Sequence, residues 1–294
     1  MTAHQSGRLD VYQAVTDSII QALEAGATTY ECPWHRQSNL GNPANAATGN
    51  QYHGVNVIAL WAAAMVSGYT SNLWATYLQW QNIGANVRRG ERSSIVVFYK
   101  KLPYEVEDPR TGEKREFAHL FARASRVFNA TQVDGFTIPD RPPRDLVERI
   151  DNVEQFVRGT RADIRPGGSE AFYSVAGDYV AMPPSDSFIG TATSTATECY
   201  YSVLLHELVH WTGASHRLNR DLSDRFGGKG YAMEELVAEL GAAFLCSKLE
   251  IASTPRADHA AYIANWLEVL KADKRAIFTA ASQASEAADY LTYM

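Results

Sequence analysis

The segment HELVH at residues 206–210 holds the residue types of a metal-dependent hydrolase. On a helix, residues four apart lie about 40° apart around the axis, so the imidazoles of His206 and His210 leave one face and can share one metal ion. Glu207 follows His206, where its carboxylate can take a proton from a water molecule at the ion and deliver it to a leaving amine. The flanking residues are apolar nearly all round the helix. Because unpaired polar groups in a buried helix are costly, a bound ion would account for all three.

A hydrolytic zinc site needs a third protein ligand and leaves a fourth position for water. His216 completes the pattern HExxHxxGxxH, in which the glycine lets the chain turn back toward the ion. Glu235 shares a helix face with Glu239 at i,i+4, so one carboxylate can bind the ion while the other accepts a hydrogen bond from a ligand histidine. Glu234 lies about 100° away around that helix and is less well placed. The residues alone leave His216 and Glu235 as alternatives.

Cations and aromatic side chains gather in the first half of the chain. Such groups neutralise phosphates and stack on unstacked bases, the two requirements of sequence-tolerant binding to single-stranded nucleic acid. The candidate DNA contacts are Trp34, Arg36, Tyr52, Trp74, Arg88, Arg89, Arg92, Lys100 and Lys101. The competing interpretation, which composition alone favours, is that most of these aromatics belong to the core and the cations to a solvated surface. The sequence holds no zinc knuckle, helix-turn-helix or Walker phosphate loop that would favour duplex DNA or a nucleotide.

Hydrophobic periodicity and helix-ending glycines predict the elements that position these residues. In the first half we expect helices at 9–25, at 55–67 and near 74–83, a long loop over 29–54, and strands within 87–101 and 117–129. In the second half we expect helices near 145–158, 196–213, 232–250 and 257–272, and a hairpin over 171–184 with its turn at 176–178. The fold class that follows is α+β in both halves, with helices dominating the second.

The length of 294 residues suits two domains, and 46% hydrophobic with 20% charged residues excludes a disordered or collagen-like chain. Three of the eleven prolines lie in residues 134–145, where we place a linker between a DNA-binding domain over 1–133 and a metallopeptidase domain over 146–294. The net charge of −6 argues against binding nucleic acid through overall charge. However, residues 1–130 carry 12 Lys and Arg against 10 Asp and Glu, and the remainder carries 15 against 23. The first half is therefore compatible with such a partner.

Cysteine usage and the N-terminus indicate the compartment. Three cysteines at long spacings, without a CxxC pair, predict neither a disulfide framework nor a cysteine zinc site. The N-terminus lacks an apolar signal core, and apolar stretches such as 55–66 are too short to span a bilayer. We therefore expect a soluble, cytoplasmic protein without a membrane partner.

Taken together, the motifs resemble the ArdC antirestriction proteins over nearly the whole chain. PWHR, YHGVN, GYTSNLW, GANVRRGE and VVFYK resemble the N-terminal domain of that family, and HELVHWTGASHRLNR followed by EELVAELGAAFL resembles its C-terminal metallopeptidase domain. The resemblance implies a bacterial, plasmid-encoded protein with a zincin-like C-terminal fold. It also implies sequence-nonspecific binding to single-stranded DNA and protection of incoming conjugative plasmid DNA from host restriction.

Carried over to this sequence, the resemblance makes His206 and His210 metal ligands and Glu207 the general base. It favours Glu235 as the third ligand, because the position of His216 is not reliably histidine in the family. We therefore expect a zinc-dependent metalloendopeptidase, whose protein substrate could be a component of the restriction machinery. The same ligand types would also accept another divalent ion such as Mn²⁺.

Two alternative functions predict different results. A DNA-coating protein with an inactive or structural metal domain would keep its DNA binding and its protection from restriction after Glu207→Ala. A general intracellular zinc peptidase would show no salt-dependent binding of an oligonucleotide.

Overall fold

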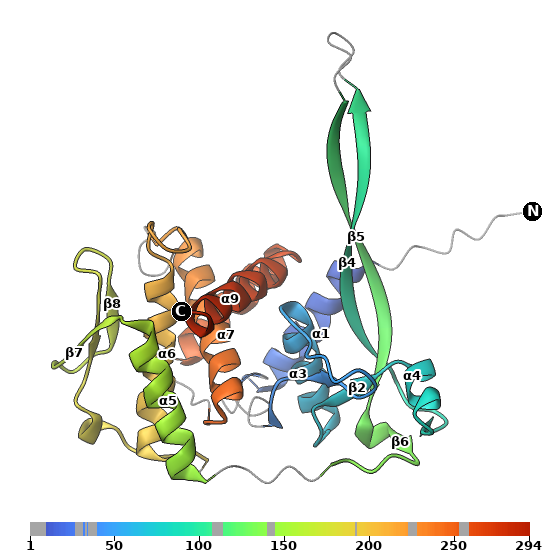
Figure 1. Cartoon of the computed structure of the whole chain (residues 1–294), viewed down its shortest axis with the longest axis horizontal. Helices are drawn as coiled ribbons and strands as arrows, with labels where there is room; N and C mark the ends of the chain where they lie inside the picture. Colours follow the sequence, from blue (N-terminus) through green and yellow to red (C-terminus); the bar gives the residue numbers. More distant parts are fainter. Residues whose placement is uncertain are drawn as a thin grey trace, which may run out of the picture.

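A computed structural model of the chain describes residues 10–26, 32, 34, 40–107, 114–139, 145–191, 193–222, 228–252 and 259–294, with the backbone alone for 100–107, 114–121, 229 and 259–262. Both halves of the described chain combine helices with a sheet, so the predicted α+β class is confirmed. Figure 1 shows a mostly helical second half beside a first half from which a long hairpin rises.

The first half is organised around a sheet with the strand order β1–β2–β5–β4. Its elements are α1 (Val11–Gly26), β1 (Ala44–Asn45), α3 (Val55–Ser67), β2 (Leu73–Ala75), α4 (Tyr77–Asn82), β3 (Asn86–Val87), β4 (Ser94–Glu107), β5 (Lys114–Asn129) and β6 (Val133–Asp134). Strand β4 pairs antiparallel with β5 along its whole length, and the two form the hairpin that leaves the body of the molecule (Figure 1). Strands β3 and β6 form a separate two-stranded sheet.

The predicted helix near residues 74–83 is wrong at its start. Trp74 and Ala75 belong to β2 and pair with β5, so their backbone groups form hydrogen bonds of the sheet and not of a helix. Helix α4 begins after Thr76, whose hydroxyl accepts a hydrogen bond from the Gln79 N–H, while the Gln79 side chain accepts one from the Thr76 N–H. This reciprocal cap fixes the start of the helix beyond Trp74.

The second half packs helices against a small sheet with the order β7–β9–β8. Its elements are α5 (Leu146–Thr160), β7 (Asp163–Pro166), β8 (Phe172–Ser174), β9 (Tyr179–Met182), α6 (Ala196–Thr212), α7 (Lys229–Leu249), α8 (His259–Ala272) and α9 (Ala276–Thr292). The predicted hairpin is present as β8 and β9. Strand β7 and helix α9 are present in the structure but were not predicted from the sequence.

One hydrophobic core joins the two halves. The ring of Trp34 lies 5.8 Å from that of Trp266 on α8, measured between centroids. The backbone N–H of Gly54 donates a hydrogen bond to the Ser285 hydroxyl on α9 at 3.1 Å. Figure 1 shows α9 running from the other C-terminal helices toward α1 and α3. The halves therefore pack against each other through shared apolar residues.

The predicted linker at residues 134–145 connects β6 to α5, and its residues 140–144 lie outside the described part of the chain. The domain boundaries stay a prediction. In the part of the chain that the structure describes, no helix is both long and apolar enough to cross a bilayer.

Candidate metal centre

Helix α6 presents both histidines of the HELVH segment at one point inside the protein. The helix begins at a capping box, in which the side chains of Thr195 and Glu198 each accept a hydrogen bond from the other residue's backbone N–H. The Nε2 atoms of His206 and His210 lie 3.2 Å apart. Because His206 is only 2% exposed, these nitrogens meet in a site shielded from solvent.

Helix α7 lies close to α6 because residue 241 is a glycine. A Cβ at Gly241 would lie 2.8 Å from Cγ2 of Val209, closer than side-chain carbons approach. The close packing brings Glu235 to the histidines: its carboxylate oxygens lie 3.6 Å from Nε2 of His206 and 3.4 Å from Nε2 of His210. One ligand atom from each of these three residues lies within 4.8 Å of the others.

The three side chains fit a divalent ion in donor type and in charge. Two imidazole nitrogens and a carboxylate oxygen form a ligand set of hydrolytic zinc sites. Burial lowers the pKa of His210, but hydrogen bonds and charges from Glu234 and Glu235 outweigh it and raise the pKa to about 10. Burial raises the pKa of Glu235, and the two histidines outweigh it and hold that pKa well below its usual range. The surroundings therefore favour positive charge where the three side chains meet.

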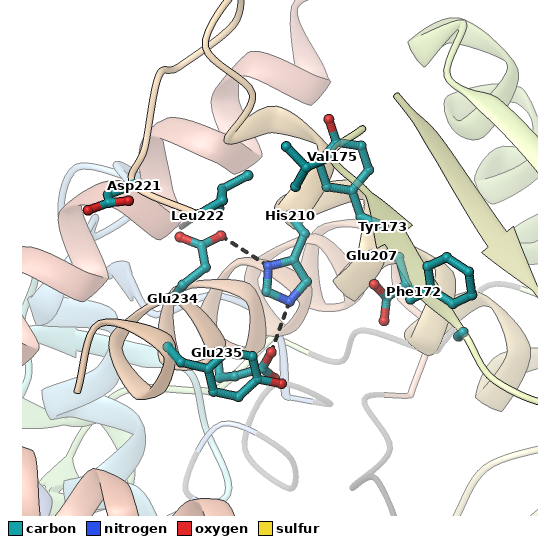
Figure 2. A pocket seen from close by; sticks show the side chains of 11 residues that line it. Phe172, Tyr173, Val175, Glu207, His210, Asp221, Leu222, Glu234 and Glu235 are labelled. Atoms are coloured by element: carbon teal, nitrogen blue, oxygen red, sulfur yellow. Dashed lines mark hydrogen bonds and ion pairs between the residues drawn. The ribbon is translucent and has the colours of Figure 1, made fainter. Parts of the chain in front are cut away.

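Glu234 orients His210 from the side opposite the shared point (Figure 2). Its carboxylate lies 3.0 Å from Nδ1 of His210 and accepts two hydrogen bonds from Arg220, at 2.9 and 2.8 Å. A carboxylate in this position fixes the ring of a ligand histidine and increases the basicity of its other nitrogen. The helical angle places Glu234 off the ligand face, as the structure shows. The sequence did not predict that Glu234 orients the ring of His210. Arg220, a cation of the HRLNR segment directly beyond the HELVH helix, is the sequence feature that could have indicated a buried carboxylate partner.

Glu239 takes the corresponding place beside His206. One of its carboxylate oxygens lies 3.5 Å from Nδ1 of His206, and the residue is 6% exposed. Glu235 and Glu239 are one helical turn apart on α7, so the first faces the Nε2 atoms and the second lies behind one imidazole. This is the placement that their i,i+4 spacing predicts, and their roles toward an ion stay a prediction.

His216 lies away from the metal-site histidines. Its side chain is 61% exposed, and its Nε2 lies 3.3 Å from the Asp178 carboxylate and 2.7 Å from the Arg217 guanidinium. Arg217 donates hydrogen bonds to Asp178 and to the Tyr173 hydroxyl, and so ties the β8–β9 hairpin to the end of α6. Of the two alternatives for a third ligand, Glu235 is the one that reaches both imidazoles.

A cavity of about 240 Å³ opens beside His210 and Glu235 (Figure 2). Glu207, His210 and Glu235 line it, and the remaining wall is formed by Ala171, Phe172, Tyr173, Val175, Asp221, Leu222, Tyr231 and Glu234. Glu207 is 3% exposed, so its carboxylate lies in a largely desolvated position. The arrangement can hold a cation, admit a small part of a substrate and offer it a carboxylate base.

Two tryptophans proposed as DNA-stacking residues belong to the core, which corrects that expectation. Trp34 is 0% exposed and packs on Trp266, and Trp74 is 1% exposed with its ring 5.7 Å from that of Tyr69. Neither ring can stack on a base without disrupting the core. The third aromatic candidate, Tyr52, is 7% exposed and lines a second cavity described below.

The predicted basic patch is only partly available to a partner. Its exposed arginines are Arg88, Arg89 and Arg92, in the turn between β3 and β4. The guanidinium of Arg88 donates a hydrogen bond to the Thr131 carbonyl at 2.6 Å and pairs with Glu91 at 2.8 Å, so it stabilises the turn. The structure does not describe Arg36 or the side chains of Lys100 and Lys101.

Two family models match this chain. Residues 9–128 match the N-terminal domain of anti-restriction factor ArdC, and residues 151–283 match a zincin-like metallopeptidase, MPTase-PolyVal. The three residues that could hold an ion lie within the second match.

Relatives and solved structures extend the likeness over the whole chain. Uncharacterized protein y4eC of Sinorhizobium fredii is 46% identical over 96% of this chain and 91% of its own length. DNA primase TraC of Escherichia coli is 32% identical over 95% of this chain, which spans only 27% of the primase. Antirestriction protein ArdC from plasmid R388 has a TM-score of 0.75 in its metal-free crystal structure, with 39% identity over 97% of both chains, and 0.74 in its Mn(II)-bound structure, with 37% identity over 97% and 98%. The chain therefore belongs to the family of ArdC antirestriction proteins.

Proposed function

We propose that this protein is a zinc-dependent peptidase that also binds single-stranded DNA without sequence preference and protects incoming plasmid DNA from restriction. The observation that carries the peptidase part is the convergence of His206, His210 and Glu235 beside a cavity that Glu207 also lines. Membership of the antirestriction family supports the biological role.

The residues divide the chemistry among them. His206, His210 and Glu235 would hold the ion, with Glu234 and Glu239 orienting the imidazoles. A divalent ion bound there supplies Lewis-acid polarisation of a peptide carbonyl and acidifies a water molecule. The Glu207 carboxylate accepts the proton released when water attacks and returns it to the leaving amine.

Strand β8 supports a peptide as the substrate. In the described part of the chain it pairs only with β9 and forms one edge of its sheet. Phe172 and Tyr173 of this strand line the cavity. An extended peptide could add to such an edge through backbone hydrogen bonds and bring a scissile carbonyl to the cavity.

The DNA part of the proposal draws on the first half of the chain. Arg89 and Arg92 are exposed in the turn before β4. Their guanidiniums can neutralise phosphates without regard to sequence. Because the two halves share one core, a DNA strand bound in this way would be held by the same folded unit as the peptidase half.

The decisive variant is Glu207→Gln, which keeps the size of the side chain and removes the base. We expect it to retain about one zinc ion per chain and to lose proteolysis, while exposed Glu170→Gln retains both. The two variants are then compared in conjugation into restricting and non-restricting recipients. Loss of plasmid protection with Glu207→Gln would tie the peptidase to antirestriction. Full protection without proteolysis would instead favour a DNA-coating protein, and proteolysis that persists would refute the assigned base.

A further inference from the structure

A second cavity, of about 580 Å³, lies where the first half of the chain meets helix α9. It shares no residue with the cavity of the metal centre. Its walls come from residues 45–56, from Gln79 of α4, from β4 and from α9. The lining residues are Asn45, Thr48, Asn50, Gln51, Tyr52, His53, Gly54, Val55, Asn56, Gln79, Val97, Phe98, Tyr99, Phe278, Ser282 and Ser285.

The walls of this cavity suit a flat, hydrogen-bonding ring next to a negative charge. Phe98 and Tyr99 are 49% and 44% exposed, so part of each ring is open to a ligand. The exposed Asn50 and Gln51 add amide donors and acceptors. Among the described residues that line it, none carries a carboxylate, although the whole chain holds 33 Asp and Glu. A phosphate near this cavity would therefore meet no repelling side chain on its wall.

The floor of the cavity is held rigidly. Buried Asn56 donates to the Val97 carbonyl at 2.8 Å and accepts from the Val97 N–H at 2.7 Å, which fixes the first turn of α3 against β4. The Asn45 amide donates to the Tyr52 hydroxyl at 3.4 Å and to the Gln79 side chain at 3.2 Å. A preformed site loses less conformational entropy when a ligand binds.

A cation borders the aromatic wall. The Arg275 guanidinium lies 5.0 Å from the Tyr12 ring centroid, and Tyr12 packs on Phe278 with centroids 4.7 Å apart. Burial and a hydrogen bond with Tyr12 raise the pKa of Tyr99, and the charge of Arg275 acts in the opposite direction. Through Tyr12 and Phe278, a positive charge therefore lies near one end of the cavity.

We propose that this cavity receives an unstacked base of single-stranded DNA. The base stacks against the ring of Phe98, its edge meets the Asn50 and Gln51 amides, and a flanking phosphate lies toward Arg275. A volume of about 580 Å³ is within the range of small-ligand sites and is ample for a base with its sugar. The inference rests on the proposed function, single-stranded DNA binding, and adds where and how the strand is held. It makes helix α9, from the metallopeptidase half, part of the DNA site.

The first test measures binding of a fluorescent oligo(dT) by anisotropy at low salt. Phe98→Ala should weaken binding about fivefold or more, because base stacking on an aromatic ring contributes strongly to affinity. Tyr77→Ala is the matched control, since Tyr77 is also 49% exposed but lies outside the cavity. The control should bind like the unmodified protein.

A second pair of variants blocks the cavity without removing an aromatic residue. Ser282 is exposed on α9, so Ser282→Trp should fill the cavity and weaken binding to a similar extent with the fold retained. Ala264→Trp places the same ring at an exposed position of α8 and should bind normally. A loss at Ser282 would be notable because this residue lies in the half matched by the metallopeptidase model.

The oligonucleotide itself can also be varied. An oligomer of abasic sugar-phosphate units should bind the unmodified protein more weakly than oligo(dT), and Phe98→Ala should abolish most of that difference. If the unmodified protein binds oligo(dT) but Phe98→Ala and Ser282→Trp equal their controls, the cavity proposal is overturned while DNA binding stands. If the unmodified protein does not bind oligo(dT), the proposed DNA function and the cavity proposal both fail.

Discussion

The metal centre and the cavity beside Phe98 are assembled in opposite ways. The centre takes His206 and His210 from one turn of α6 and Glu235 from the helix packed on it. The cavity brings together residues as distant as Gly54 and Ser285, which are 231 positions apart and joined by a hydrogen bond. A site that must fix one small ion depends on short helical spacings. A cavity for a larger ligand can be formed by tertiary packing alone.

The largest expected effect is on the free energy of unfolding, which should distinguish buried aromatic residues from exposed ones. Trp74→Ala should lower the free energy of unfolding by about 3–5 kcal/mol, because it empties a large buried site. Phe98→Ala should change it by less than about 1 kcal/mol, since that ring is half exposed. Urea denaturation followed by circular dichroism measures both. A Trp74→Ala protein of normal stability and poor DNA binding would restore Trp74 as a DNA contact.

The next effect concerns the third ligand. Glu235→Ala should weaken zinc binding more than about 100-fold, beyond the usual effect of an outer hydrogen-bonding partner. His216→Ala should leave zinc affinity unchanged, because the side chain is exposed and paired with Asp178. Competition with a chromogenic chelator measures both affinities. The reverse pattern would assign the ligand to His216 and require the segment after α6 to rearrange.

A smaller effect tests the carboxylate behind His210. Glu234→Gln keeps the side-chain volume but removes the charge that faces Nδ1 of His210 and Arg220. We expect zinc affinity to fall about 10- to 100-fold. Exposed Glu170→Gln serves as the control for loss of one negative charge. Equal affinities in the same chelator titration would show that Glu234 has only a structural role.

The smallest effect probes the basic turn. Replacing Arg89 and Arg92 by Gln should weaken oligonucleotide binding about three- to tenfold and reduce the slope of log K against log salt by about 1.4. The double variant Arg158→Gln, Arg165→Gln removes two exposed arginines from the other half and should leave binding unaltered. Titrations at several salt concentrations give the slopes. An unchanged slope would exclude the turn from the DNA path.

The geometry of the candidate metal centre was predictable because it depends on helical periodicity. The spacing of His206 and His210, and of Glu235 and Glu239, places each pair on one face of its helix whatever else the chain does. The role of Glu234 was not predictable in this way, since it depends on how α7 packs against α6 and on the position of Arg220. Packing between helices, unlike periodicity within one, is not visible in a single sequence.

The first half was less predictable for two physical reasons. Tryptophan serves equally well in a core and on a stacking surface, and only tertiary burial assigns Trp34 and Trp74 to the core. Helix α9 was overlooked because its buried face consists mainly of alanines, which give a weak hydrophobic pattern. Helix α9 forms one wall of the cavity of the proposed DNA site. Without a prediction of this helix, the cavity could not be predicted either.

The core that joins the halves has a thermodynamic consequence. Since Trp34 packs on Trp266 and Gly54 is bonded to Ser285, neither half can unfold without exposing apolar surface of the other. We expect heating to melt the chain in one cooperative transition. An ion bound by the folded state alone raises the melting temperature of everything in that transition. The metal site would then stabilise the DNA-binding surface against heat without touching it.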